Sequence, residues 1–110
     1  MIKNYIKKII NNIISKKVDP KNLLKTHLSL TYGDQKGQVD YLINNVFNYE
    51  KNGLPKNGFF LDLACGDGIF WNNTFFLEKF LNWRGILFEP NPKFKNKIIN
   101  SRVSKLVTNV

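Results

Sequence analysis

A short apolar run followed by a turn of small residues is the feature that most constrains the fold of this chain. Residues 59–63 are apolar except for Asp62, which is typical of a strand buried on both faces of a parallel sheet. The next residues, Ala64-Cys-Gly-Asp-Gly68, are small at alternate positions, so the backbone can turn sharply and approach a ligand closely. The pattern predicts a strand that ends in a ligand-binding turn.

The residues after the turn continue as alternating helices and strands. The spacing of apolar residues between Phe70 and Leu81 predicts a crossover helix, and residues 85–89 predict a second apolar strand. A third helix is expected over residues 92–99 and a third strand from Val103. Such alternation builds parallel sheets with right-handed crossovers, whose ligands bind beyond the carboxyl ends of the strands. The sequence predicts an α/β fold of the Rossmann type.

The first 32 residues predict an amphipathic helix and a linker. Isoleucines recur there at helical spacing: Ile2, Ile6, Ile9, Ile10, Ile13 and Ile14. The stripe suits either a membrane or partner surface or packing on the domain, and we favour packing. Residues 20–37 lack sustained periodicity and predict a turn or a flexible lid, and a second helix is expected over residues 38–49.

The length of the chain bounds its organisation. The 110 residues suffice for one small domain, whereas a whole Rossmann-type domain of this kind needs more than about 150 residues. We therefore expect residues 33–110 to form the N-terminal half of a domain that is truncated after the start of its third strand. If the chain is complete, that strand is an open edge that invites self-association.

The net charge of +9 lies in the two ends of the chain. Residues 1–25 carry +6, residues 26–92 carry −2 and residues 93–110 carry +5. Nucleic-acid binding is disfavoured because Arg84 and Arg102 are the only arginines that could make bidentate contacts. The single cysteine, Cys65, excludes an internal disulfide and disfavours a zinc site. With no apolar run of about 18 residues and no secretory leader, the sequence predicts a cytoplasmic protein.

Two acidic residues predict which cofactor the turn binds. Glu89 ends the second strand 21 residues beyond Gly68, where a carboxylate can accept hydrogen bonds from both ribose hydroxyls of an adenosine. A dinucleotide fingerprint needs a third glycine where this chain has Trp71, so NAD is disfavoured. S-adenosylmethionine has no pyrophosphate and needs an open turn with one acid for its ammonium and one for its ribose. Asp62 and Glu89 fit these two roles.

The motifs also resemble a known family, the FkbM-type methyltransferases, over roughly residues 33–110. The resemblance rests on Gly58-Phe-Phe-Leu-Asp62, Gly66-Asp-Gly68, Asn73-Thr74, Phe76-Leu-Glu-Lys79, Asn82-Trp-Arg-Gly85, Glu89-Pro-Asn-Pro92 and Ser101-Arg102. It departs from the family at Ala64, where a glycine is common. It implies S-adenosyl-L-methionine as cofactor and methyl transfer to a hydroxyl oxygen of a sugar, glycan or other small molecule.

The turn and the resemblance together give the candidate cofactor-binding residues: Asp62, Ala64, Gly66, Asp67, Gly68, Glu89, Pro90 and Asn91. By resemblance Asp62, Gly66 and Gly68 line the methionine end, Glu89 holds the ribose, and Pro90 and Asn91 border the adenine. Asp67 either contacts the cofactor or caps the following helix.

Other polar and aromatic residues have plainer interpretations. The only histidine, His27, is expected to be exposed or locally bonded, so no catalytic base is assigned. Trp71 and Trp83 are expected in the core. A noncatalytic basic or nucleic-acid-binding module that keeps half a Rossmann fold stays open as the alternative function.

Overall fold

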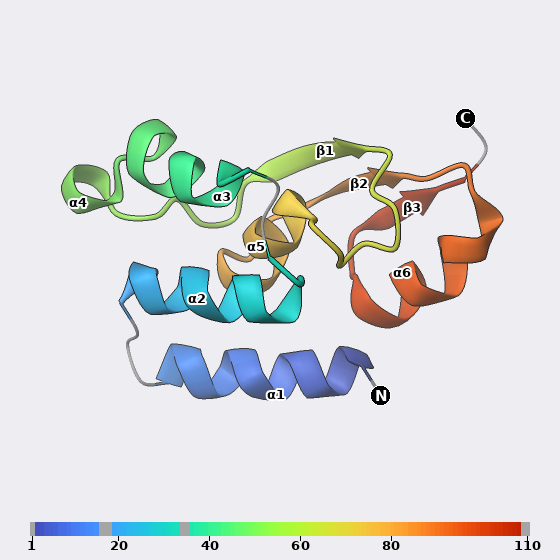
Figure 1. Cartoon of the computed structure of the whole chain (residues 1–110), viewed down its shortest axis with the longest axis horizontal. Helices are drawn as coiled ribbons and strands as arrows, with labels where there is room; N and C mark the ends of the chain where they lie inside the picture. Colours follow the sequence, from blue (N-terminus) through green and yellow to red (C-terminus); the bar gives the residue numbers. More distant parts are fainter. Residues whose placement is uncertain (1, 16–18, 34–35, 109–110) are drawn as a thin grey trace.

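The computed structural model describes residues 2–15, 19–33 and 36–108, which form a mixed α/β fold (Figure 1). Its elements, in chain order, are α1 (Ile2–Ser15), α2 (Pro20–Leu30), α3 (Gln38–Tyr41), the π-helical η1 (Leu42–Val46), α4 (Tyr49–Asn52), β1 (Phe59–Leu63), α5 (Asn73–Phe80), β2 (Arg84–Phe88), the 3-10 turn η2 (Pro92–Phe94), α6 (Lys95–Ser101) and β3 (Lys105–Val107). The predicted α/β class is confirmed.

The three strands form one parallel sheet in the order β1-β2-β3. Leu61 of β1 lies opposite Ile86 of β2, and Phe88 of β2 lies opposite Val107 of β3. Helix α5 connects β1 to β2, and α6 connects β2 to β3, as the sequence predicted. Residues 109–110, which the third strand was expected to include, lie outside the described part of the chain.

Helices α1, α2, α5 and α6 lie on one side of the sheet, and α3, η1 and α4 lie beyond the amino end of β1 (Figure 1). Helix α5 packs against the sheet because Phe75 and Phe76 are fully buried, and α1 and α2 both contact α5. Of the isoleucine stripe on α1, Ile6 is buried and Ile9 is half-buried, which confirms packing on the domain at these two positions. The side chains of Ile2, Ile10, Ile13 and Ile14 lie outside the described part.

The expectation of a lid over residues 20–37 is wrong for its first part, because Pro20–Leu30 form helix α2. Asp19 caps this helix by accepting a hydrogen bond from Lys21 N (2.8 Å), and Pro20 occupies the first turn. Proline is favoured there because the first-turn N–H groups have no helical partner. Helix α2 was missed because residues 20–37 show no sustained periodicity in the sequence.

The helix expected over residues 38–49 is present but interrupted. It begins at Gln38 as α3 and widens into the π-helical turn η1 before Asn48 adopts a left-handed φ of 51°. Val39 and Ile43 are buried as predicted. Val46 is 60% exposed because the wider turn rotates the end of the segment away from the core.

One face of β1 differs from the prediction. Phe59, Leu61 and Leu63 are 64%, 59% and 74% exposed, whereas Phe60 on the helix-covered face is buried. No element of the described chain covers the other face of β1, so the strand is buried on one face only. Strand β1 also pairs with β2 alone, so both β1 and β3 are edges of the described sheet. The expectation of an open edge at the third strand therefore extends to the first.

Candidate functional site

The turn after β1 has the backbone geometry that its small residues predicted. Ala64, Gly66 and Gly68 all have positive φ angles, of 65°, 61° and 82°. Ala64 N and Cys65 N both donate to Phe88 O, at 2.8 and 3.1 Å, so the turn is fixed to the end of β2. Glycine adopts such angles without strain, whereas alanine is strained there, which explains why a glycine would suit the position of Ala64.

Glu89 lies directly against this turn. It is 7% exposed, and its Oε1 accepts from Gly66 N (2.8 Å) while its Oε2 accepts from Asn91 N (2.9 Å). Each carboxylate oxygen has a second lone pair that can accept from a ligand hydroxyl. The structure thus brings the second predicted acid and the glycine turn together at the carboxyl edge of the sheet.

Asp62 reaches the same edge from β1. Its Oδ2 accepts from Asn72 Nδ2 (2.9 Å) and from the Thr74 hydroxyl, and both partners belong to the start of α5. In the described part of the chain its other oxygen, Oδ1, has no hydrogen-bond partner. Two bonds to one oxygen hold the carboxylate in place and leave the other oxygen for a cationic ligand.

A hollow of about 360 Å³ opens beside Asp62. It is lined by Asp62, Leu63, Ala64, Cys65, Gly66, Phe70, Trp71, Asn72, Asn73 and Thr74. Three predicted cofactor residues, Asp62, Ala64 and Gly66, therefore line it. Gly68, Glu89, Pro90 and Asn91 lie beside the turn and do not line the hollow itself.

The prediction that Trp71 belongs to the core is wrong. Its side chain is 49% exposed, stacks on Phe70 with ring centroids 4.9 Å apart, and donates from Nε1 to Tyr32 O (3.0 Å). Helix α5 begins only at Asn73, so Trp71 lies in the preceding loop with a left-handed φ of 50°. Trp83 is half-buried and packs against the core, as predicted.

Of the two roles left open for Asp67, capping of the following helix is wrong. Its Oδ1 accepts from Ile69 N and Phe70 N, both at 2.8 Å, and its Oδ2 lies 3.6 Å from Lys97 Nζ. The residue that caps α5 is instead Asn72, whose side chain accepts from Phe75 N. Asp67 therefore stabilises the loop between the glycine turn and α5 by hydrogen bonds to neighbouring backbone N–H groups.

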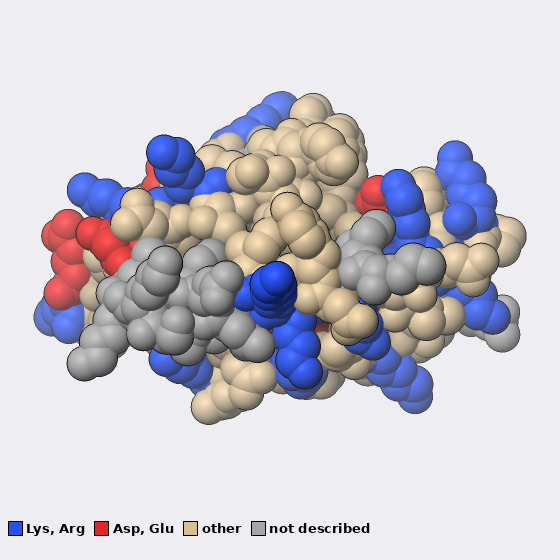
Figure 2. Space-filling view, turned by 90° about the horizontal axis from the view of Figure 1, so that it is seen from below, with Lys and Arg blue, Asp and Glu red and all other residues tan. Residues whose placement is uncertain are grey.

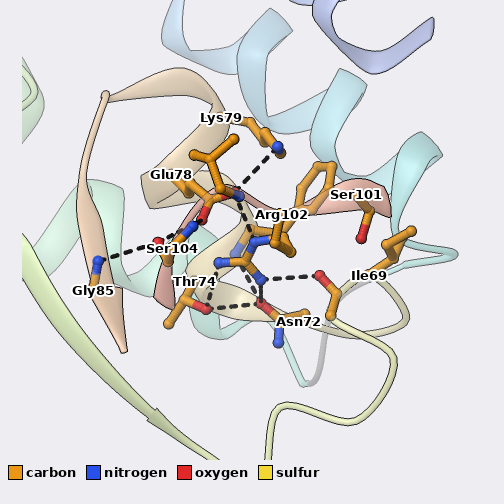
Figure 3. A network of polar contacts seen from close by, with 12 residues as sticks. Ile69, Asn72, Thr74, Glu78, Lys79, Gly85, Ser101, Arg102 and Ser104 are labelled. Atoms are coloured by element: carbon orange, nitrogen blue, oxygen red, sulfur yellow. Dashed lines mark hydrogen bonds and ion pairs between the residues drawn. The ribbon is translucent and has the colours of Figure 1, made fainter. Parts of the chain in front are cut away.

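A buried polar network behind the hollow was not predicted from the sequence (Figure 3). Arg102 is 3% exposed, and its Nε donates to Glu78 Oε2 (2.8 Å). One terminal nitrogen of the guanidinium donates to Gly68 O and to Asn72 Oδ1 (both 3.0 Å). The other terminal nitrogen donates to Thr74 Oγ1 (3.1 Å). Asn72 and Thr74 are the two residues that hold Asp62. Arg102 thereby fixes both the glycine turn and the carboxylate at its entrance.

Glu78 stays ionised inside this network. Burial alone would raise its pKa, but the Arg102 guanidinium, the Ser104 hydroxyl and Lys79 lower the pKa to about 2. The sequence held one signal for the network, because Ser101-Arg102 belongs to the family resemblance. The four segments that it joins could not be inferred from local patterns.

The two remaining candidate nucleophiles or bases are unsuited to proton transfer at the hollow. Burial, with Asp62 next, raises the pKa of the Cys65 thiol to about 12, so the thiol stays protonated. The expectation that His27 is exposed is wrong, because it is 1% exposed and its ring packs against Phe75 and Phe76. It lies on the core-facing side of α2 and does not line the hollow.

His27 makes the stability of the fold sensitive to acid. Burial and then Arg102 lower its pKa from 6.5 to about 4, so the unfolded chain takes up a proton near pH 6.5 and the folded chain only near pH 4. The contribution of His27 to the free energy of unfolding is therefore fully present above pH 6.5. It falls by about 3 kcal/mol as the pH is lowered to 4. Urea unfolding across this range measures the loss.

The matched variant His27→Leu removes the titrating ring and keeps an apolar side chain of similar size. We expect its stability to change little between pH 6.5 and 5, because the contribution of Glu78 is lost only as the pH falls from its ordinary pKa of 4.5 toward about 2. Parallel losses in both proteins would assign the acid sensitivity to other groups.

Comparisons with protein-family models, with characterised proteins and with solved structures gave no match to this chain. Within the described residues there is no group of three or more histidine, cysteine or acidic side chains that could hold a metal ion. No helix in the same residues is long and apolar enough to cross a membrane. The function is therefore inferred from the geometry of the site.

Proposed function

We propose that this chain binds S-adenosyl-L-methionine and belongs to an FkbM-like methyltransferase that methylates a hydroxyl group of a sugar or other small molecule. One observation carries the proposal: Asp62 and Glu89 end adjacent parallel strands and flank a left-handed glycine turn that Glu89 itself holds through Gly66 N. Ligands of parallel α/β sheets bind at this edge.

The chemistry of the hollow suits the charged end of the cofactor. S-adenosylmethionine carries an ammonium and a positively charged sulfonium. The Oδ1 atom of Asp62 can accept from the ammonium, and the stacked rings of Phe70 and Trp71 line the same hollow. Aromatic faces attract cations, so the rings favour the positively charged donor over its neutral product.

Glu89 suits the ribose of the same ligand. Its carboxylate is fixed by the amides of Gly66 and Asn91, so no side-chain freedom is lost when two ribose hydroxyls donate to it. Pro90 and Asn91 are exposed beside it, where the adenine of a bound cofactor would lie. Asn91 is itself held because its Oδ1 accepts from Lys93 N (3.1 Å).

The reaction needs little covalent participation by the protein. When bound, S-adenosylmethionine would supply its methyl group to the acceptor oxygen, with the carbon–sulfur bond breaking to leave a neutral thioether and the hydroxyl proton passing to a base. Holding the oxygen in line at near-attack distance supplies most of the acceleration. We assign no base, since His27 is buried elsewhere and Cys65 keeps its proton.

Calorimetric titration of the 110-residue chain with S-adenosylhomocysteine and, separately, with NAD tests the proposal. We expect saturable binding of S-adenosylhomocysteine with a stoichiometry near one and no heat of binding from NAD, because Trp71 replaces the third glycine of the dinucleotide fingerprint, which close packing of helix and strand requires. A folded chain that binds NAD, or neither ligand, would contradict it. Circular dichroism of the same samples establishes that the chain is folded.

A further inference from the structure

A second hollow, of about 550 Å³, lies at the opposite end of the strands from the proposed cofactor site. It is lined by α1, by Lys56 before β1, by the end of α5 and by Arg84, the first residue of β2. It therefore opens at the amino ends of the strands, whereas Asp62 and Glu89 lie at their carboxyl ends. With Val103, which follows α6, its walls come from five separate parts of the chain.

The charged residues that line this hollow are almost all basic. Lys3, Lys7, Lys56, Lys79 and Arg84 face a single acid, Glu78. Figure 2 looks onto the side of the molecule on which α1 lies and shows basic side chains spread over it with few acidic ones between them. The concentration of positive charge at the hollow is thus part of a basic face.

The one acid does not neutralise this charge. Glu78 is fully buried and accepts from Arg102, from Lys79 (3.1 Å) and from the backbone N–H groups of Val103 and Ser104. Its negative charge is therefore balanced by Arg102 behind the hollow wall and by Lys79, which lines the hollow. Among the described residues no ion pair involves Lys3, Lys7, Lys56 or Arg84.

Lys79 shows the same surplus of positive charge. Its ammonium is buried, which lowers its pKa; Glu78 opposes this, and Arg102 and Lys3 lower it further. Lys79 lines the hollow with an ammonium that is paired with Glu78 and is also repelled by the positive charge of Lys3. An anionic ligand in the hollow would remove this repulsion.

We propose that this second hollow is a binding site for a small free polyanion that carries several phosphate groups. Unpaired basic side chains from α1, from the segment before β1 and from β2 converge on it, and lysine ammonium groups bind phosphate as mobile point charges. Several phosphate groups on one compact ligand match several cations, whereas one carboxylate would leave most of them unpaired. The inference does not depend on the proposed methyltransferase function.

Titration of the 110-residue chain with inorganic tripolyphosphate by calorimetry at low and at high salt tests this site. We expect saturable binding that weakens with salt and is unaffected by S-adenosylhomocysteine, because the two sites lie at opposite ends of the strands. The double variant Lys3→Gln/Lys56→Gln removes cations from two separate walls and is expected to bind roughly tenfold or more weakly.

Lys8→Gln is the matched control, since Lys8 is an exposed lysine of α1 that does not line the hollow. It should bind like the unaltered chain. Equal weakening in the control and the double variant, or no binding at all, would overturn the site. Two other results would contradict the proposal that the ligand is a small free polyanion. One is co-sedimentation of the chain with phosphatidylcholine–phosphatidylglycerol vesicles that tripolyphosphate does not displace. The other is binding of an RNA oligonucleotide that is tighter than that of tripolyphosphate and is lost in the same double variant.

Discussion

Replacing Arg102 by methionine is expected to lower the free energy of unfolding by about 3–5 kcal/mol. The change removes the guanidinium that pairs with Glu78 and leaves that carboxylate buried, with Lys79 as its only cationic neighbour. It also removes the donors to Gly68 O and Asn72 Oδ1. Because small domains have a total stability of roughly 5–15 kcal/mol, urea unfolding should show a greatly destabilised or unfolded chain.

Two further variants show whether the loss of stability comes from the buried network. Arg102→Lys keeps the charge but cannot reach four acceptors at once, so its stability should lie between those of the methionine variant and the unaltered chain. Arg84→Met changes the other arginine, which is exposed, and should change stability by no more than about 0.5 kcal/mol. A loss below about 1 kcal/mol in Arg102→Met would mean that the buried network does not hold the fold together.

Replacing Glu89 by glutamine is expected to weaken S-adenosylhomocysteine binding by roughly 30- to 100-fold. The amide keeps the size of the side chain but loses the charge that strengthens hydrogen bonds from ribose hydroxyls. One of the two carboxylate oxygens is replaced by an NH2 group, which is a donor and faces the donor N–H of either Gly66 or Asn91. The turn therefore also loses one of its two hydrogen bonds to this side chain. Calorimetry measures the affinity, and thermal unfolding measures the cost to the fold.

Glu50→Gln is the matched control for this prediction. Glu50 is an exposed residue of α4, on a different segment from the turn, and the chemical change is identical. Its affinity for S-adenosylhomocysteine should equal that of the unaltered chain. If Glu89→Gln remains folded and binds as tightly as the control, Glu89 does not contact the ligand.

The site elements that could be predicted from the sequence are those fixed by local residue chemistry. The apolar run before Ala64 gave β1, the small residues gave the left-handed turn, and the spacing to Glu89 placed the second acid at the end of β2. Parallel pairing then brings both strand ends to one edge. These inferences need only a few neighbouring residues and one topological rule.

The features that the sequence did not reveal depend on contacts between distant segments. Nothing near Arg102 indicates that it reaches Gly68, Asn72 and Glu78, because their partnership exists only after α5 and β3 have packed. The burial of His27 follows from its place on α2, a helix that was missed because residues 20–37 show no sustained periodicity. The exposed face of β1 could not be foreseen either, since an apolar strand has the same sequence whether one or two faces are covered.

The most direct test of the proposed S-adenosylmethionine site is a map of backbone amide shifts in the isotope-labelled chain during titration with S-adenosylhomocysteine. We predict the largest changes at Gly66, at Asn91 and at the indole N–H of Trp71, which surround the two acids. The amides of α1 at the second hollow should not move. Saturable binding that leaves Gly66 and Trp71 unchanged, or a folded chain with no shift changes at all, would contradict the assignment of the cofactor to this edge of the sheet.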